Sequence, residues 1–337
     1  MTPIVLALLM VLGIPAGAWA VPKESETNIL PSAPSTQPAH VQRVQPAVVG
    51  IKTLIPMDRP SVRTLGPERW GSGVIFDPAG YAVTVSYVLT DAEIIQVSLR
   101  DGRTVPGKLV GIDQEAGLGV LKLEGAGPWP AASFGDSSKV KPGEVTATIG
   151  VKDDNELVVT QGSIQEVRPF AGYWEYLLER AFLVAPYNPS FGGSPLVNTQ
   201  GEIIGITNLR LGENPPVNVA VPIELLVANK DELIAKGRVF SRPPRPWLGL
   251  YTVAINDVVV VAGFSPTGPA GQSGLQRGDV IVRVNGEKVE SQEEFYRKLW
   301  KAKVGDEIAL VVLRESRFEV ITVRSVDRYQ IQRAPKP

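Results

Sequence analysis

The chain has 337 residues, of which 44% are hydrophobic and 20% charged, a composition that fits two folded domains and excludes an intrinsically disordered chain. Its 34 basic and 35 acidic residues give a net charge of −1, so the charge balance does not indicate a nucleic acid or an anionic membrane surface as the main partner. With no cysteine and one histidine, disulfides and cysteine nucleophiles are excluded, and we expect no metal site and no cofactor. A protein or peptide partner is the remaining expectation.

The N-terminus carries an apolar run over residues 4–14, followed by Ala18, Trp19 and Ala20 in an A-x-A cleavage pattern. This pattern predicts a signal peptide over residues 1–20, and therefore secretion to a periplasmic or other extracytoplasmic location. The alternative is a retained membrane anchor, because no Lys or Arg precedes the apolar run.

Residues 21–40 are rich in Pro, Ser and Thr and contain no aromatic residue, which predicts a solvated tether that includes His40. Residues 41–240 then alternate short β-branched runs with turn signals and predict two β-barrels side by side. The expected strands cover residues 48–55, 74–76, 81–86, 94–99 and 118–123, then 145–149, 157–167, 181–184, 194–197 and 202–209. A closing helix is expected over residues 221–236, with Gly237 as its stop.

The segment 241–246 reads Ser-Arg-Pro-Pro-Arg-Pro, which predicts an extended, semi-rigid linker to a second domain over residues 247–330, followed by a tail over 331–337. Within that domain, Ser291 and Glu294 form a capping box that predicts the start of a helix.

Three segments of the first region resemble the HtrA/Deg family, in which a trypsin-like serine protease precedes a C-terminal PDZ domain. Residues 71–81 (GSGVIFDPAGY) resemble the entry to the strand that carries the catalytic histidine, and the continuation places Tyr87 at the histidine position. Residues 111–122 resemble the segment of the catalytic aspartate and place Gly117 there. Residues 188–198 resemble the nucleophile loop and place Gly192 at the serine. The resemblance implies a mainly β fold, a trypsin-like double β-barrel followed by an α+β PDZ domain.

The three replacements imply that no Ser-His-Asp triad remains, because a serine hydroxyl needs a positioned imidazole and that imidazole needs a carboxylate. Tyrosine titrates near pH 10 and glycine has no side chain, so neither can take these roles at neutral pH. The oxyanion loop Ser190–Phe191–Gly192 is also expected to be distorted, since Ser190 stands where the family has glycine. Ser194 with Lys122 or Lys152 as base is a minor alternative to a turn serine.

The second domain resembles a bacterial PDZ domain in the segments 247–250 and 265–286. The resemblance implies that the loop at Leu248, Gly249 and Leu250 binds a peptide's terminal carboxylate through backbone N–H groups while the peptide adds a strand to the sheet. Phe295 and Leu299 share one helix face and are expected either to wall this groove or to lie in the core.

These features together predict an HtrA-like pseudoprotease, a secreted scaffold that binds peptide C-termini or unfolded protein segments. One alternative is an HtrA-type serine endopeptidase acting in extracytoplasmic protein quality control. Another is a non-catalytic subunit that joins an active homologous protease. We expect no nucleic-acid partner, and a membrane partner only if the N-terminal segment is retained.

Overall fold

The computed structural model describes residues 37–256 and 258–331. The predicted signal peptide, most of the predicted tether and most of the predicted tail lie outside the described residues. Within the described ranges, no helix is long and apolar enough to cross a bilayer.

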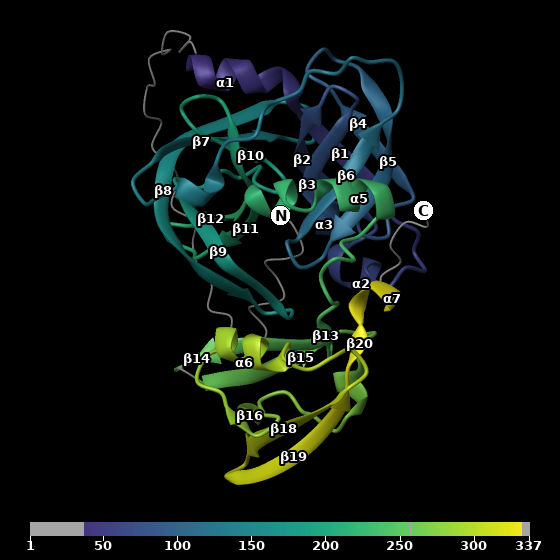
Figure 1. The fold of residues 1–337 in the computed structure, drawn as a ribbon, viewed down its shortest axis with the longest axis vertical. Coiled ribbons are helices and arrows are strands. Elements are labelled where there is room, and N and C mark those ends of the chain that lie inside the picture. Colours follow the sequence, from purple (N-terminus) through teal and green to yellow (C-terminus); the bar gives the residue numbers. More distant parts are fainter. Residues whose placement is uncertain (1–36, 257, 332–337) are drawn as a thin grey trace, which may run out of the picture. The chain divides into compact units, whose positions relative to one another are not determined.

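Residues 48–123 form a closed barrel with the strand order β1-β2-β3-β6-β5-β4 (Figure 1). Its strands are β1 (Val48–Leu54), β2 (Glu68–Asp77), β3 (Tyr81–Val85), β4 (Ile94–Ser98), β5 (Thr104–Asp113) and β6 (Leu118–Leu123), and its short helices are α2 (Val62–Leu65) and α3 (Ser86–Leu89). Strand β5 was not predicted, because Pro106 and Gly107 interrupt its β-branched pattern.

A second closed barrel follows, with the strand order β10-β11-β12-β9-β8-β7. Its strands are β7 (Val145–Val151), β8 (Leu157–Gly172), β9 (Tyr176–Ala185), β10 (Pro195–Val197), β11 (Ile203–Leu211) and β12 (Val217–Pro222). The surrounding helices are α1 (Ala39–Val44), η1 (Gln45–Ala47), η2 (Ser137–Lys139), α4 (Glu224–Val227) and α5 (Lys230–Lys236). One hydrophobic cluster runs through both barrels, as expected for strands with buried Val, Ile and Leu.

The third region has a two-stranded sheet of β13 and β20 and a larger sheet with the order β14-β15-β16-β18-β19, where β17 pairs with β16. Its elements are β13 (Pro246–Trp247), β14 (Leu250–Ile255), β15 (Val258–Phe264), η3 (Pro269–Gln272), β16 (Val280–Val284), β17 (Glu287–Lys288), α6 (Gln292–Leu299), β18 (Glu307–Arg314), β19 (Arg317–Arg324), β20 (Val326–Asp327) and α7 (Arg328–Ile331). The mainly β fold class predicted from the sequence is therefore confirmed. Helix α6 begins as predicted, since the Ser291 hydroxyl accepts the Glu294 N–H at 3.1 Å.

The single helix predicted over residues 221–236 is wrong. Residues up to Pro222 continue strand β12, which pairs with β11 and β9, and two short helices follow. Asn229 separates them, with a non-helical φ of −126°, and its amide bonds back to the Leu225 carbonyl at 2.9 Å. The predicted stop is correct, because Gly237 ends α5 in a left-handed conformation.

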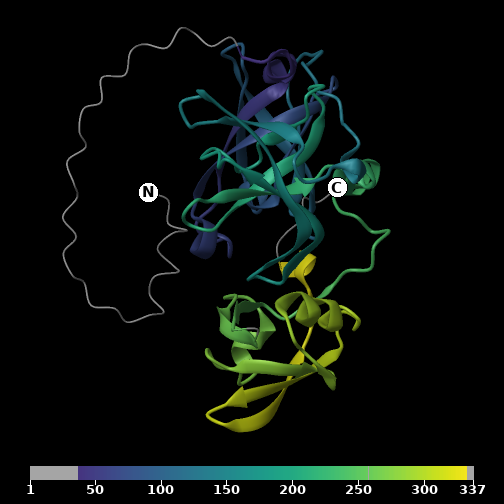
Figure 2. The same ribbon diagram turned by 90° about the vertical axis from the view of Figure 1, so that its left-hand side faces the viewer.

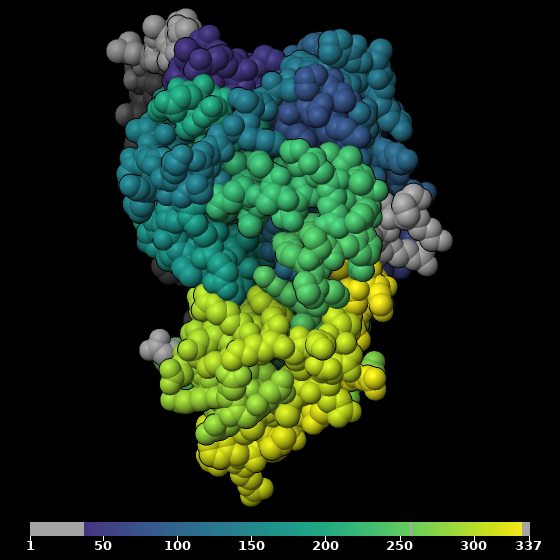
Figure 3. Space-filling model, viewed as in Figure 1, coloured from purple at the N-terminus to yellow at the C-terminus, as the bar shows by residue number. Residues whose placement is uncertain are grey.

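The prediction of a solvated His40 is also wrong, because α1 begins at Ala39. Val41 and Val44 bury their side chains in the barrel core and hold the helix against the barrels, where Figure 3 shows it in purple. His40 is half-buried on this helix beside the turn at Gly201, and its Nε2 is buried without a hydrogen-bond partner.

The hairpin formed by β8 and β9 reaches from the second barrel to the third region, as Figures 1 and 2 show. The two strands stay paired to their ends, where Gly172 faces Tyr176. Only residues 173–175 form the turn. This hairpin therefore carries its tip out of the barrel and against strand β14.

Candidate functional site

The structure brings the three predicted triad positions to one place between the barrels. Tyr87 lies on α3, directly after β3, and Gly192 lies in the loop between β9 and β10. A Cβ atom at Gly192 would lie only 2.6 Å from the Tyr87 hydroxyl. Gly117 precedes β6, and its carbonyl accepts the Ser86 N–H at 2.8 Å, one residue before Tyr87.

Tyr87 is held at both ends. Its hydroxyl donates to the Asn208 carbonyl at 3.2 Å, and its own carbonyl accepts from the Arg69 guanidinium at 2.7 Å. Burial raises the pKa of the Tyr87 phenol well above its ordinary value, with a smaller contribution from Tyr187. A phenol with a raised pKa cannot accept a proton as a general base near neutral pH.

Gly117 has a left-handed backbone and no room for a side chain. Its φ is +72°, and a Cβ atom there would lie 2.8 Å from the Tyr176 hydroxyl and 3.1 Å from the Asn208 amide nitrogen. The Tyr176 hydroxyl donates to the Ala116 carbonyl at 2.8 Å. Sequence reasoning missed Tyr176 and Asn208, because nothing in their strand patterns distinguishes them from ordinary buried residues.

Backbone N–H groups on either side of Gly192 form hydrogen bonds within the protein. The Ser190 N–H donates to the Asn188 side chain at 2.8 Å, so it does not face a substrate carbonyl. Gly193 has a φ of +86°, and its N–H donates to the Thr207 carbonyl at 2.9 Å. The first of these contacts occupies the Ser190 N–H, which belongs to the expected oxyanion loop Ser190–Phe191–Gly192.

Ser194 is fully buried, and its hydroxyl donates to the Ser190 carbonyl. The two lysines considered as its base have other partners. The Lys122 ammonium lies 4.1 Å from the centre of the Tyr81 ring, and that of Lys152 lies 2.7 Å from the Glu156 carboxylate. These contacts give no support to a serine–lysine pair.

The second candidate site is the loop at Leu248, Gly249 and Leu250, at the start of edge strand β14. Gly249 has a φ of +76°, and a Cβ atom there would lie 2.5 Å from the Cα atom of Gly268, so only glycine fits. The left-handed residue between two ordinary ones turns successive N–H groups to one side, which makes an anion-binding concavity.

A carboxylate already lies in this concavity, and it comes from Glu175 at the tip of the β8–β9 hairpin. Its oxygens accept from the Leu250 N–H at 2.7 Å and from the Leu248 N–H at 3.1 Å. Burial raises the pKa of Glu175 to about 7, and the loop N–H groups and the charge of Arg328 oppose that rise.

The same hairpin tip bonds to the sheet edge and to helix α6. The Thr252 N–H of β14 donates to the Tyr173 carbonyl at 2.8 Å. The Tyr296 hydroxyl donates to the Gly172 carbonyl at 2.7 Å and accepts the Glu175 N–H at 3.2 Å. Gln292, one helical turn before Tyr296, donates to the Thr252 carbonyl at 2.7 Å.

Phe295 and Leu299 are fully buried in the hydrophobic cluster of the third region, together with Leu248 and Leu250. The polar contacts that helix α6 makes to the hairpin tip come from Gln292 and Tyr296, which sequence reasoning missed. The sequence spacing could have indicated this pair, since residues 292 and 296 share one face of α6 at i, i+4 spacing. The assignment of Phe295 and Leu299 to a peptide groove stays a prediction.

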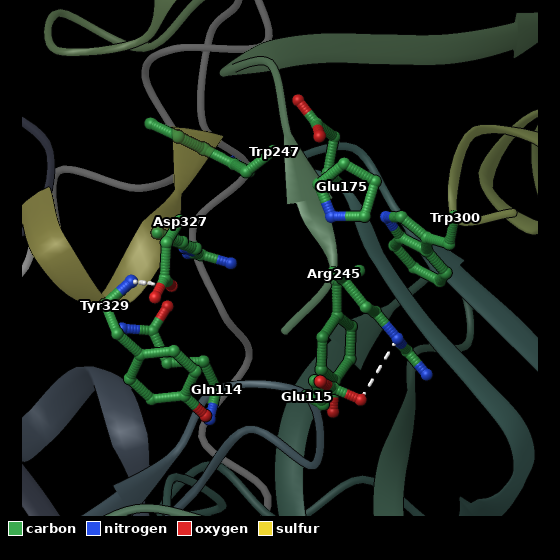
Figure 4. Close-up of a pocket in the computed structure, with 11 residues that line it drawn as sticks. Gln114, Glu115, Glu175, Arg245, Trp247, Trp300, Asp327 and Tyr329 are labelled. Carbon is green, nitrogen blue, oxygen red and sulfur yellow. Dashed lines mark hydrogen bonds and ion pairs between the residues drawn. The ribbon is translucent and has the colours of Figure 1, made fainter. Parts of the chain in front are cut away.

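A cavity of about 30 Å³ is lined by Glu175 and by other residues of the barrels, the linker and the third region (Figure 4). One wall carries the ion pair between the Arg245 guanidinium and the Glu115 carboxylate at 3.0 Å, and Arg245 also stacks on Trp300 with 4.0 Å to the ring centre. The cavity holds room for only one or two waters.

Two closed six-stranded barrels followed by a small sheet-and-helix region define a trypsin-like peptidase fold with a PDZ domain. The trypsin-like peptidase domain family matches residues 71–206, and the PDZ domain family matches residues 246–324. Relatives that are 30% identical and are covered over 70% and 87% of their length show that the chain belongs to the HtrA/Deg family of serine proteases.

Among these relatives, Serine protease Do-like HtrA of Bacillus subtilis is 30% identical over 313 residues, covering 82% of this chain and 70% of the relative. Serine endoprotease DegS of Salmonella typhimurium is 30% identical over 317 residues, covering 88% of this chain and 87% of the relative. "Probable periplasmic serine endoprotease DegP-like" of Halomonas elongata is 31% identical over 271 residues, 75% of this chain. The chain spans about half the length of that Halomonas protein, 55%.

Solved structures agree with this family. The "HtrA-type protease AlgW with decapeptide" is 27% identical with a TM-score of 0.54, covering 88% of this chain and 98% of that one. The serine endoprotease from Yersinia pestis is 28% identical with a TM-score of 0.52, covering 88% of this chain and 99% of that one.

Proposed function

We propose that this chain is a peptide-binding member of the HtrA/Deg family that does not cleave proteins by the family's serine mechanism. The observation that carries the proposal is the contact between Tyr87 and Gly192. At the two positions where the family resemblance expects a base and a nucleophile, a phenol fills the space beside a residue with no side chain.

The chemistry of these residues supports the proposal. A raised pKa takes Tyr87 further from a base, and Gly192 offers no hydroxyl to attack a carbonyl. Gly117 cannot orient an imidazole, and the space beside it is filled by Tyr176. Loss of the nucleophile or base alone reduces turnover by about 10⁶-fold in a well-studied serine protease, so three losses leave no usable mechanism.

The binding half of the proposal rests on the PDZ domain. The loop at Leu248 and Leu250 holds a carboxylate through two N–H groups, and β14 is an edge strand. These are the two features by which a PDZ domain holds a peptide's C-terminus. The peptide in the similar AlgW structure supports the same ligand class for this chain. We place the protein outside the cytoplasm, in agreement with the predicted signal peptide and the periplasmic relative.

A second candidate function is serine endopeptidase activity, because the relatives are named as serine proteases. A fluorophosphonate probe separates the two functions, since it labels an activated serine. We expect the purified chain to remain unlabelled and to leave casein intact, while an active HtrA-type protease is labelled in parallel. The Ser194→Ala variant is the matched control, because Ser194 is the one serine considered as a substitute nucleophile.

Labelling of the wild-type chain, with labelling and casein cleavage both lost in one serine variant, would make the protein an endopeptidase and overturn the proposal. A chain that stays unlabelled but co-purifies with an active homologue would instead be a non-catalytic subunit of that protease. Recovery of no such homologue excludes this arrangement and leaves the separate scaffold.

A further inference from the structure

Glu175 occupies a backbone position that does not suit it. It ends the three-residue turn of the β8–β9 hairpin with a φ of +57°, in the left-handed region where such turns favour glycine. A residue with a Cβ atom is less stable there by about 1–2 kcal/mol. The carboxylate in the loop of the PDZ domain offers a reason for a glutamate at this position.

The hairpin tip presents the three features of a bound peptide end. Its carboxylate lies on the Leu248 and Leu250 N–H groups. Two residues earlier, the Tyr173 carbonyl accepts from the Thr252 N–H of the sheet edge. Leu177, two residues after Glu175, is buried in the hydrophobic cluster of the PDZ domain. Carboxylate capture, strand addition and an apolar anchor are how an extended peptide binds a sheet edge.

We propose that the hairpin tip is an internal ligand of the PDZ domain, in which Glu175 takes the place of a C-terminal carboxylate and an incoming peptide must displace it. This rests on the proposed function, because it assumes that the groove binds peptides with free carboxyl termini. The site is thereby closed in the resting protein and opens when the hairpin leaves.

Displacement follows from hydrogen-bond capacity. Each backbone N–H is a single donor, so the two groups that hold Glu175 cannot hold a second carboxylate. The apparent affinity for a peptide is then the intrinsic affinity reduced by the fraction of molecules with the hairpin released. If that fraction is about 1–10%, removing the Glu175 carboxylate tightens peptide binding by about 10- to 100-fold.

The test measures binding of fluorescent octapeptides to the full chain by anisotropy. One pool has mixed residues at seven positions and ends in Val, Leu or Phe with a free carboxylate, and a second pool has the same residues with a carboxamide end. The variants are Glu175→Ala and Glu175→Gly, of which the second also removes the left-handed strain. The matched control is Glu166→Ala, on the same hairpin but exposed and paired with Arg168 of its own strand.

We expect both Glu175 variants to bind the free-carboxylate pool at least 10-fold tighter than wild type does, and Glu166→Ala to bind it as wild type does. None of the four proteins should bind the carboxamide pool more tightly than the free-carboxylate pool. Equal binding by wild type and the Glu175 variants overturns the internal ligand while leaving the proposed function intact. No binding by any of the four proteins overturns the proposed peptide-binding function and the internal ligand with it.

Amide hydrogen exchange gives an independent reading on the wild-type chain. Adding the free-carboxylate pool at saturation should speed exchange over residues 173–177, because the hairpin leaves, while residues 250–255 stay protected by the incoming strand. Unchanged exchange at 173–177 in the peptide-bound protein overturns the proposal, since both ligands would then be bound at once.

Discussion

The Tyr87 hydroxyl lies 2.6 Å from the place that a Cβ atom at Gly192 would take, and the Tyr176 hydroxyl lies 2.8 Å from the corresponding place at Gly117. Two tyrosines thus fill the space next to two glycines. Both phenols are also hydrogen-bonded, to the carbonyls of Asn208 and Ala116. Restoring a serine or an aspartate therefore requires that a packed, bonded side chain moves.

A first prediction concerns Gly192→Ser. The new Cβ atom forces the Tyr87 ring to shift, and overpacking of this kind costs about 1–3 kcal/mol of the free energy of unfolding. In a Tyr87→Phe background the contacting oxygen is absent, so the same substitution should cost less. Urea denaturation of the four proteins measures both costs, and equal costs in the two backgrounds would contradict the contact.

A second prediction concerns how the protonation of Glu175 changes the free energy of unfolding with pH. The pKa of Glu175 is raised by burial from 4.5 to about 7, so the folded protein binds a proton that the unfolded chain has released. Protonation of Glu175 therefore stabilises the folded protein fully below pH 4.5, and this stabilisation is lost as the pH rises to 7. Each unit of difference between the folded and unfolded pKa is worth about 1.4 kcal/mol. The facing groups, Arg328 and Tyr296, do not titrate in this range.

The measurement compares the free energy of unfolding of wild type with that of Glu175→Gln between pH 4.5 and 8. From pH 4.5 to pH 7, wild type should lose about 3 kcal/mol of its free energy of unfolding relative to Glu175→Gln. Above pH 7 the difference should stay constant. A difference that is flat with pH, or one that moves in wild type's favour as the pH rises, contradicts a buried Glu175 carboxyl.

At the scale of elements, sequence patterns predicted most of the strands, the start of α6 and the stop of α5. Local signals carry these features, namely β-branched runs, a capping serine and a glycine. The β8–β9 hairpin was underestimated, because residues 168–180 mix polar and apolar side chains that contact a second domain. Glu175 and Tyr296 are hydrogen-bonded although they lie 121 residues apart in the sequence, and single-sequence patterns hold no information on such pairs.

Arg69 anchors helix α3, which carries Tyr87, through hydrogen bonds. Its guanidinium is buried and donates to the Tyr87 and Thr90 carbonyls at the end of α3, at 2.7 and 2.8 Å, and to the Ser61 hydroxyl at 2.7 Å. Burial lowers its pKa to about 10, so it stays charged at neutral pH. Charged donors to buried carbonyls are worth about 1.5–3 kcal/mol each.

A third prediction concerns the anchoring of α3. Arg69→Ala leaves these carbonyls unsatisfied and should reduce the free energy of unfolding by about 3 kcal/mol or more. Arg63→Ala, an exposed arginine of the neighbouring α2, is the matched control and should change it by less than about 0.5 kcal/mol. Similar losses in the two variants, measured by urea denaturation, would contradict the bonding assigned to Arg69.

For the whole molecule, one turn of chain connects the two candidate sites. The Glu175 carboxyl group is bound by the loop at residues 248–250 of the PDZ domain, and the next residue, Tyr176, fills the space beside Gly117. The loop before Gly117 is in turn held by the linker, because Arg242 bonds Asp113 and Arg245 bonds Glu115. Release of the hairpin would therefore disturb the Gly117 site as well as open the groove.

The last prediction ranks the ion pairs that join the barrels to the linker and to the PDZ domain. The Arg242 guanidinium lies 2.6 Å from the Asp113 carboxylate, which is only 3% exposed. Arg242→Ala leaves that carboxylate buried with only its two backbone donors, and should cost about 2–3 kcal/mol of the free energy of unfolding. The pair between Arg297 of α6 and Glu179 of β9 has a similar distance, 2.7 Å, but its side chains are 42% and 61% exposed.

Solvent screens that exposed pair, so Arg297→Ala should cost less than about 1 kcal/mol and should lose even this in high salt. Urea denaturation at low and high ionic strength compares the two variants directly. If Arg297→Ala proves as costly as Arg242→Ala, then burial does not rank these contacts, and the linker has no special part in holding the Asp113 loop. The expected ranking instead makes the linker a structural partner of the loop beside Gly117.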